Sequence, residues 1–286
     1  MSKTDMILVA DSGSTKTDWT LSSRGYGIVE VHTSGINPVR DSRDAIFRVV
    51  EDELVPHLPQ GCAPVGIYFY GAGCMQPYSE QVRQVLEHTF PGADVQVESD
   101  LLGAARALCG HQPGIACILG TGANSCLYDG QSIIAHVPPL GFILGDEGSG
   151  AVLGRTLLGN LLKGIFPSEM KEEFLAEYDL TEPSIIDRVY RQPQPNRFLA
   201  SLVPFIASHR EHPQAHAMLV ESFRQFLSRN VRAYGHAELP VNFVGGIAST
   251  FADELTEAAH AEGMAVGRIL RSPIQEMAAY HNTVSQ

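Results

Sequence analysis

The chain has 286 residues, 44% of them hydrophobic, which is enough for two modest domains or one large domain with a full core. Its formal net charge of −12 argues against nucleic acid or an anionic membrane as the main partner, because both bind basic surfaces. No apolar run reaches the roughly 20 residues of a membrane-spanning helix, the first residues are not typical of a signal peptide, and the five cysteines include no C-x-x-C pair. We therefore expect a cytoplasmic protein with reduced thiols.

The first part of the chain predicts three consecutive strands followed by alternating helices and strands. Turn-forming residues separate the strands at Ser12–Thr15 and Arg24–Gly25. The expected elements, in chain order, are strands near 6–11, 17–23 and 27–33, a helix at 42–58, a strand at 66–73, a helix at 78–90, a strand at 93–99 and a helix at 101–109.

The second part begins again in the same way. Residues 116–137, "ACILGTGANSCLYDGQSIIAHV", predict three strands joined by two turns, and "PVNFVGGIAS" at 240–249 matches "GIYFYGAG" at 66–73 in character. A helix at 250–262, a strand at 264–270 and a helix at 273–282 complete the pattern, whereas 146–239 is mostly helical. The chain therefore predicts two copies of one βββαβαβ unit, the second carrying a helical insertion.

This duplication predicts two lobes. We expect an N-terminal lobe at 1–108, a C-terminal lobe at 109–272 with the helical insertion at about 146–239, and a last helix at about 273–286 that packs back on the first lobe. A duplicated α/β protein is expected to hold its ligand in the cleft between the copies, where strand ends face each other.

Two matching turns carry the residues of a phosphate site. In "DSGSTKT" (11–17), exposed N–H groups and hydroxyls can hold phosphate oxygens, Asp11 can hold Mg²⁺ directly or through water, and Lys16 can supply a positive charge. The turn "GTGAN" (120–124) of the second copy can bind the same phosphates. Mg²⁺ and backbone dipoles would then neutralise ATP, which explains how an acidic protein binds an anionic nucleotide.

Two further segments of the second copy belong to this predicted site. The stretch "GFILGDEGSG" (141–150) places Asp146 and Glu147 at the start of a helix. At Gly245-Gly246 the backbone has no side chains, so a flat group such as a nucleoside can lie close to it.

Six ordered motifs, "DSGSTKTDW", "SGINP", "ESDLLGAARAL", "ILGTGANS", "GDEGSG" and "FVGGIAS", extend over nearly the whole chain. Together they resemble the N-acetylglucosamine kinase and BadF/BcrA-type ATPase family, within the actin-like superfamily of sugar kinases, actin and heat-shock chaperones. The resemblance implies an α/β fold of duplicated actin-like ATPase (ribonuclease H-like) domains, with a cleft between two lobes. It also implies ATP-dependent, Mg²⁺-assisted phosphorylation of an amino sugar, N-acetylglucosamine to its 6-phosphate, and allows a homodimer.

The resemblance assigns a role to each motif residue. Asp100 corresponds to the catalytic carboxylate that takes the proton from the attacking sugar hydroxyl, and Asp11 to the residue beside the metal. The residues implied to bind the nucleotide are Gly13, Ser14, Thr15, Lys16, Thr17, Gly120, Thr121, Gly122, Gly245, Gly246 and Ser249. Those implied to bind the sugar are Asn37, Gly71, Asn124 and Asp146.

The identity of the sugar stays open at this stage. Relatives specific for N-acetylglucosamine often carry an aromatic residue a few positions before "GDEGS", and here that region reads Pro138-Pro139-Leu140-Gly141-Phe142. Glucosamine and N-acetylmuramate are therefore alternatives.

Structural roles compete with the functional ones for several of these residues. Asp11 could cap a turn, Asp100 could cap the helix that follows it, and Asp146 or Glu147 could be purely structural at a helix start. The histidines of "SHREHPQAH" (208–216) have spacing that suggests a metal site, but a solvated loop is favoured because Pro213 interrupts the helical register.

Two other functions are alternatives to a sugar kinase. Cys117, just before the second phosphate turn, resembles a cysteine of the BadF-type activators, which share an iron–sulfur cluster across a dimer and drive acyl-CoA enzymes. Core packing is the competing interpretation of Cys117. The other alternative is a non-catalytic, nucleotide-switched scaffold of the chaperone type.

Overall fold

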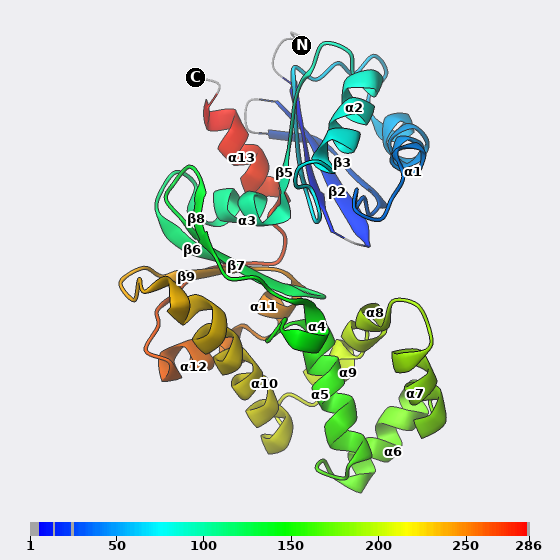
Figure 1. The fold of residues 1–286 in the computed structure, drawn as a ribbon, viewed down its shortest axis with the longest axis vertical. Helices are drawn as coiled ribbons and strands as arrows, with labels where there is room; N and C mark the ends of the chain where they lie inside the picture. The colour runs from blue at the N-terminus through cyan, green and yellow to red at the C-terminus, as the bar shows by residue number, and fades with distance from the viewer. Residues whose placement is uncertain (1–5, 14, 24–25, 285–286) are drawn as a thin grey trace. The chain divides into compact units, whose positions relative to one another are not determined.

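The computed structural model describes residues 6–13, 15–23 and 26–284, which form two compact units (Figure 1). Unit 1 comprises the described residues up to Pro113, together with Tyr128–Ile133 and the segment from Ser272 onward, and unit 2 comprises Gly114–Leu127 and Ile134–Arg271. The predicted turn at Arg24–Gly25 lies outside the described residues. The lobe limits expected from the sequence, and the cleft between the lobes, stay predictions.

Unit 1 is built on one mixed sheet with the strand order β3-β2-β1-β4-β5. Its strands are β1 (Met6–Ser12), β2 (Lys16–Ser23), β3 (Tyr26–Ser34), β4 (Gly66–Gly71) and β5 (Asp94–Ser99). The first three are antiparallel, whereas β4 and β5 run parallel to β1. All five strands predicted from this half are present, and the parallel pairing brings the carboxyl ends of β1, β4 and β5 to one edge.

Helices cover both faces of this sheet because β1 is apolar on both sides. Leu8 and Ala10 pack toward α1 (Arg43–Arg48) and α2 (Ser79–Thr89). Ile7 and Val9 face the opposite way and pack with residues of α3 (Asp100–Cys109) and α13 (Ile274–Val284). A nearly continuous apolar strand is what burial on both faces requires.

The helix predicted as one element at 42–58 is divided. After α1 the backbone widens into a π-helical segment, Val49–Leu54, and ends in a short 3₁₀ turn, Val55–His57. The apolar face expected from the 3.6-residue period is nonetheless buried, with Ile46, Val50 and Leu54 in the core. The same side chains are buried in the α-helical and the π-helical segments. The sequence pattern therefore predicted the buried face but not the helix type.

Unit 2 repeats the plan, with the strand order β10-β9-β6-β7-β8. Its strands are β6 (Gly114–Leu119), β7 (Ala123–Tyr128), β8 (Ile133–His136), β9 (Val241–Val244) and β10 (Val266–Leu270). Taken in chain order, the five strands occupy the same places as those of unit 1, and β9 runs parallel to β6 and β10. The duplicated α/β fold predicted from the sequence is confirmed.

Between β8 and β9 the chain is helical, as predicted. The helices of unit 2 are α4 (Gly141–Leu144), α5 (Gly150–Leu162), α6 (Ser168–Glu177), α7 (Glu182–Tyr190), α8 (Pro195–Ala200), α9 (Val203–Ser208), α10 (Pro213–Phe226), α11 (Gly246–Thr250) and α12 (Ala252–Ala261). They share one apolar core with the sheet, in which α5 packs on α8 and α10 packs on α12. No helix of the described residues is long and apolar enough to cross a membrane.

Candidate active site

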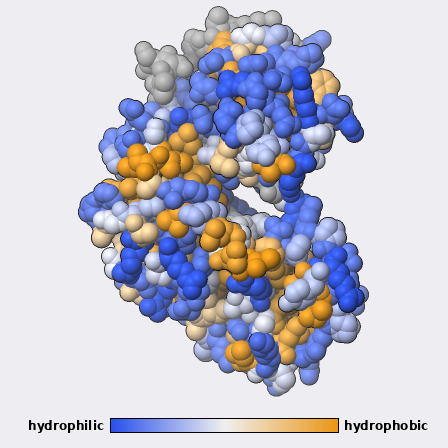
Figure 2. Space-filling model, viewed as in Figure 1, coloured by the Kyte–Doolittle hydropathy of each residue, from blue (hydrophilic) through white to orange (hydrophobic). Residues whose placement is uncertain are grey.

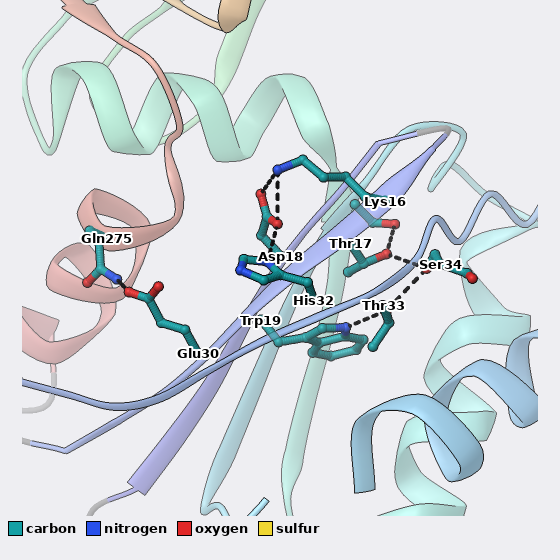
Figure 3. A network of polar contacts seen from close by, with 10 residues as sticks. Lys16, Thr17, Asp18, Trp19, Glu30, His32, Thr33, Ser34 and Gln275 are labelled. Atoms are coloured by element: carbon teal, nitrogen blue, oxygen red, sulfur yellow. Dashed lines mark hydrogen bonds and ion pairs between the residues drawn. The ribbon is translucent and has the colours of Figure 1, made fainter. Parts of the chain in front are cut away.

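The first predicted phosphate turn joins β1 to β2 in unit 1. The Oγ atoms of Ser12 and Thr17 lie 2.7 Å apart, the Ile36 N–H donates to Ser12 Oγ (3.1 Å), and Thr17 Oγ1 donates to the Ser34 carbonyl (3.2 Å; Figure 3). Both hydroxyls are buried, so they connect the hairpin to the chain after β3. Thr17 therefore has a structural role in this hairpin, whereas Gly13 and Thr15 are exposed and Ser14 lies outside the described residues.

Lys16 lies at the surface beside a carboxylate. Its Nζ is 2.7 Å from Asp18 Oδ2, and His32 Nδ1 is 2.7 Å from Asp18 Oδ1, on one side of the sheet (Figure 3). The side chains of Lys16 and His32 are 66% and 68% exposed, whereas that of Asp18 is 9% exposed. A cation held only by a partly solvated ion pair can exchange its partner for a phosphate group at small cost.

Asp11 and Asp100 form the electrostatic centre of unit 1. Burial, together with the charges of Asp100 and Asp18, raises the pKa of Asp11 to about 7, and the charge of Lys16 opposes that rise. Asp18 stands opposite Asp11 in the antiparallel register, so their side chains share a face of the sheet. Burial also raises the pKa of Asp100. Carboxylates gathered in this way are stabilised by a cation.

The donor set fits Mg²⁺. Among residues 6–13, 15–23 and 26–284, no group of three or more His, Cys, Asp or Glu side chains is arranged to hold a metal ion. Mg²⁺ needs fewer protein ligands, because it keeps several waters and takes one or two carboxylates together with phosphate oxygens. Asp11 is the residue that would hold the ion, and the carboxylate of Asp100 is close enough for its charge to act on Asp11.

Asp100 is not the cap of the helix that it begins. Ser99 is the N-cap of α3, and its Oγ accepts the N–H of Leu102 at 3.2 Å. Asp100 Oδ1 accepts the N–H of Leu101 at 2.9 Å, which opposes the effect of burial on its pKa. The capping alternative is thus met by Ser99, and the Asp100 carboxylate is available for another role.

Asn37 is held in a tight turn that the sequence analysis did not foresee. Its backbone N–H donates to Asp41 Oδ2 (2.7 Å), and its Oδ1 accepts the N–H of Val39 (3.1 Å). Gly73 lies against it: with φ at +81°, a Cβ there would stand 2.5 Å from Asn37 Oδ1. A Cβ on Gly71 would stand 2.7 Å from the Phe69 ring, so close packing explains that glycine. With Oδ1 engaged, the amide NH₂ of Asn37 is the group that can bind a hydroxyl.

In unit 2, the turn between β6 and β7 is joined to the start of α5. The N–H of Gly150 donates to the Gly120 carbonyl (2.8 Å), and that of Ala151 donates to the Thr121 carbonyl (3.1 Å). Asp146 lies beside the same turn, since its Oδ1 accepts the N–H of Ala123 (3.3 Å). Burial raises the pKa of Asp146, and the charge of Glu147 adds to that rise. The structure thus brings together the predicted 120–124 and 141–150 segments.

Glu147 and Ser149 have structural roles. Glu147 pairs with Arg229 (3.0 Å), while Ser149 caps α5 by accepting the N–H of Val152 (3.2 Å). Asn124 Oδ1 accepts the N–H of Ser125 and lies 2.9 Å from His136 Nε2, a β8 residue that sequence reasoning missed. Of the two acidic residues in this segment, Asp146 is the candidate for ligand binding.

The two glycines after β9 differ in their surroundings. Gly245 has φ of +128°, and a Cβ there would stand 2.2 Å from the Leu119 carbonyl oxygen, so packing alone requires glycine. Gly246 begins α11, is exposed, and faces open space where a Cβ would be. Ser249 follows within α11, its N–H bonded to the Gly245 carbonyl (3.1 Å). Gly246 is therefore the position at which a flat ligand could approach the backbone.

An exposed apolar segment precedes Asp146. Leu140, Ile143 and Leu144 are 61%, 73% and 74% exposed, and Figure 2 shows apolar surface gathered over α4. The Asp146 N–H donates to the Pro139 carbonyl (2.9 Å), which closes the segment into a loop. The sequence predicted a single helix start at 141–150. The chain instead forms the short helix α4, then the loop closed by the Asp146–Pro139 hydrogen bond, and then α5.

The structure also gives positions to Cys117 and to the histidines of 208–216, the residues that suggested an iron–sulfur cluster and a metal site. Cys117 is fully buried in the core of unit 2, in agreement with core packing. Of the three histidines of 208–216, His209 and His212 lie in the turn between α9 and α10, as expected, whereas His216 lies in α10. His209 is 3.2 Å from Glu173 and His216 is 2.8 Å from Glu257, so both are paired with carboxylates.

Two sheets of identical strand order, with glycine-rich turns after their first strands, define the class of actin-like ATPase folds. The chain is 46% identical to a candidate N-acetylglucosamine kinase from Porphyromonas gingivalis, with a TM-score of 0.96 over 98% of this chain and 100% of the other. This protein therefore belongs to the N-acetylglucosamine kinase and BadF/BcrA-type family of that superfamily.

More distant structures share the fold. A candidate N-acetylglucosamine kinase from Chromobacterium violaceum is 22% identical, with a TM-score of 0.75 over 98% of this chain and 99% of the other. A ROK family glucokinase from Streptomyces griseus, solved with glucose and AMPPNP, is 17% identical, with a TM-score of 0.59 over 98% of both chains. No protein-family model matches the chain, and no curated protein matches it either.

Proposed function

We propose that this protein transfers the γ-phosphoryl group of ATP to a hydroxyl of an amino sugar, with N-acetylglucosamine as the first substrate and its 6-phosphate as the product. The observation that carries the proposal is the pair of carboxylates, Asp11 and Asp100, at the strand ends of unit 1. Their negative charges repel each other, so that the charge of Asp100 raises the pKa of Asp11. Membership of the kinase family supports the same activity. A cytoplasmic location and a homodimer stay predictions.

Asp100 serves as the general base. Its carboxylate accepts the proton of the attacking hydroxyl, and a buried carboxyl with a raised pKa is better matched to that task near neutral pH than an exposed one. Ser99 caps α3 through the N–H of Leu102, so the N-cap of this helix does not depend on Asp100.

Asp11, Lys16 and the glycine turns bind the phosphates. Asp11 holds Mg²⁺ directly or through water; the ion, when bound, neutralises phosphate charge during transfer. Lys16 exchanges Asp18 for a phosphate oxygen. The Gly13 N–H is bonded to the Lys16 carbonyl within the turn (3.0 Å), so the exposed backbone at Thr15 is the part that donates an N–H group to phosphate. In unit 2 the turn 120–122 binds phosphate oxygens, and Gly246 admits the nucleoside.

The sugar is bound by polar groups and by one apolar surface. Asn37, Asn124 and Asp146 provide amide and carboxylate groups for hydroxyls, which phosphoryl transfer requires for positioning. The apolar segment that ends at Asp146 offers a contact for the methyl group of an N-acetyl substituent. This feature favours N-acetylglucosamine over glucosamine.

A substrate panel tests the proposal. Purified protein is incubated with ATP and Mg²⁺ plus N-acetylglucosamine, glucosamine, N-acetylmuramate or glucose, and ADP release is followed. We expect N-acetylglucosamine to raise ADP release most and glucose least. A sugar-independent rate that none of the four sugars raises would contradict the kinase assignment and favour the scaffold alternative.

A further inference from the structure

The helix that begins with the catalytic Asp100 is held in place by the last helix of the chain. In unit 1, α13 packs on α3 as well as on β1 and β2 (Figure 1). Gly103, one turn after Asp100, lies against both neighbours, α13 and β4. A Cβ there would stand 2.4 Å from Met277 Cε and 2.7 Å from Tyr70 Cγ. The first turn of α3 is therefore fixed between β4 and α13, with no space to shift.

Two buried side chains, Tyr70 and His281, and the partly buried Arg106 connect these elements. Arg106 of α3 donates from Nη1 to the Tyr70 hydroxyl on β4 (2.7 Å), and that hydroxyl lies 2.6 Å from His281 Nε2 on α13. Burial raises the pKa of Tyr70 to about 12 and lowers that of His281 to about 3. The phenol therefore keeps its proton and the imidazole is neutral. With the imidazole proton on Nδ1, the tyrosine hydroxyl accepts from arginine and donates to histidine Nε2.

Aromatic contacts restrain the same groups. The ring of Tyr68 stacks on that of His281, with centroids 3.5 Å apart and planes 10° from parallel. The Arg106 guanidinium lies 5.3 Å from the centre of the Tyr280 ring. Both ends of the three-residue chain are thus held by neighbours on β4 and α13, so its geometry is well defined.

We propose that Tyr70, Arg106 and His281 are positioning residues for Asp100. By joining β4, α3 and α13 they fix the position of α3. They thereby fix the position of the catalytic carboxylate relative to Asp11. The inference rests on the proposed role of Asp100 as the general base. A displacement of about 1 Å in a reacting group can cost about 100-fold in rate, so a remote connection of this kind affects turnover without touching substrate.

Substitutions that remove single groups test this role. Tyr70→Phe deletes only the shared hydroxyl, whereas His281→Leu deletes its hydrogen-bond partner together with the ring that stacks on Tyr68. We expect each to lower kcat about tenfold while the KM for ATP and for the sugar changes less than about twofold, because binding groups are untouched. His281→Gln, which retains an acceptor at similar reach, is expected to recover most of the rate.

Asn282 provides the matched control. It lies next to His281 on α13, and its Nδ2 donates to Ser22 Oγ on β2 (2.8 Å), so Asn282→Ala removes a helix-to-sheet hydrogen bond that does not involve α3. We expect Asn282→Ala to lower the melting temperature about as much as Tyr70→Phe and to leave kcat unchanged. Equal losses of kcat in both variants would mean a merely structural docking role and would overturn the inference.

A double mutant separates this inference from the proposed function. If the three residues act through Asp100, adding Tyr70→Phe to Asp100→Asn should cause no further loss of kcat. A full tenfold additional loss would overturn the inference while leaving the kinase assignment intact. A wild-type protein that phosphorylates no sugar would instead contradict the proposed function itself.

Discussion

At the scale of single residues, Asp100 has the sharpest prediction. Asp100→Asn preserves size and shape but cannot accept a proton from the sugar hydroxyl. We expect turnover to fall by about 10²–10⁴-fold, the usual contribution of a positioned base, with binding of ATP and sugar nearly retained. Steady-state kinetics together with calorimetric titration of both substrates would measure the two effects separately.

Ser99 is the control for that substitution. Ser99→Ala removes the N-cap bond to Leu102 and should cost about 1 kcal/mol of stability, but the carboxylate at Asp100 remains. We expect Ser99→Ala to lower the melting temperature with little change in kcat. Wild-type turnover in a folded, substrate-binding Asp100→Asn protein would remove Asp100 from the mechanism.

The buried carboxylate of Asp11 lowers the stability of the folded chain when it is ionised. The pKa of Asp11 is about 7 in the folded chain, whereas its ordinary value is 3.8. Between pH 3.8 and pH 7 the folded state therefore keeps a proton that the unfolded state has lost. Stability contributed by this group therefore falls as pH rises from about 4, and the full cost is present above pH 7. We predict that Asp11→Asn raises the melting temperature at pH 8 in the absence of Mg²⁺, with no gain at pH 4.

The same variant should lose its response to Mg²⁺. Stabilisation by MgATP, measured as the shift in melting temperature, should be smaller for Asp11→Asn than for the wild type because a charged ligand is lost. A variant that is no more stable at pH 8 than the wild type, or that responds fully to Mg²⁺, would contradict this account of Asp11.

At the scale of secondary structure, two helix glycines should respond in opposite ways to the same substitution. Gly103→Ala in α3 introduces a Cβ against Met277 and Tyr70, and such overpacking costs about 1–3 kcal/mol. Gly159→Ala in α5 meets no atom within 4 Å, so it should stabilise by about 0.5–1 kcal/mol through higher helix propensity. Denaturant unfolding of both variants checks the signs, and a destabilised Gly159→Ala protein would contradict the propensity argument.

At the scale of the whole molecule, His281 makes the fold sensitive to acid. It is neutral in the folded chain down to about pH 3, whereas in the unfolded chain it is protonated below about 6.5. The unfolded state therefore binds more protons between these values, and this group lowers stability progressively as pH falls from 6.5 toward 3. The cationic Arg106 and the rings of Tyr68, Tyr70 and Tyr280 surround it, with no carboxylate among these neighbours to stabilise the charged form.

Denaturant unfolding at pH 7 and pH 4.5 measures this effect. We expect the loss of unfolding free energy between the two pH values to be smaller for His281→Gln than for the wild type, because glutamine does not titrate. An identical pH dependence in the wild type and His281→Gln would show that another group controls acid stability.

Local pattern in the sequence was enough to predict most elements of both units. The end of β1 at Ser12, one residue beyond the expected limit, and the end of β6 at Leu119 follow from apolar runs that stop at small residues. The turns after these strands and the duplicated order follow from the same local pattern, which acts over a few neighbours. The seven-residue first turn also marked Lys16 and Asp11 as charged groups at a strand end. The roles of the predicted site residues stay predictions, although the structure gives each described one a position.

Tertiary structure decided which side chains meet. The bond between Tyr70 and His281 spans 211 positions, and Glu147 meets Arg229 across 82. No spacing rule relates such residues, because their contact depends on how helices pack against a sheet. Sequence alone therefore determined the elements, the repeat and the chemistry at the strand ends. Packing decided that Ser99 rather than Asp100 caps α3, and that the last helix packs on α3 with Met277 against Gly103.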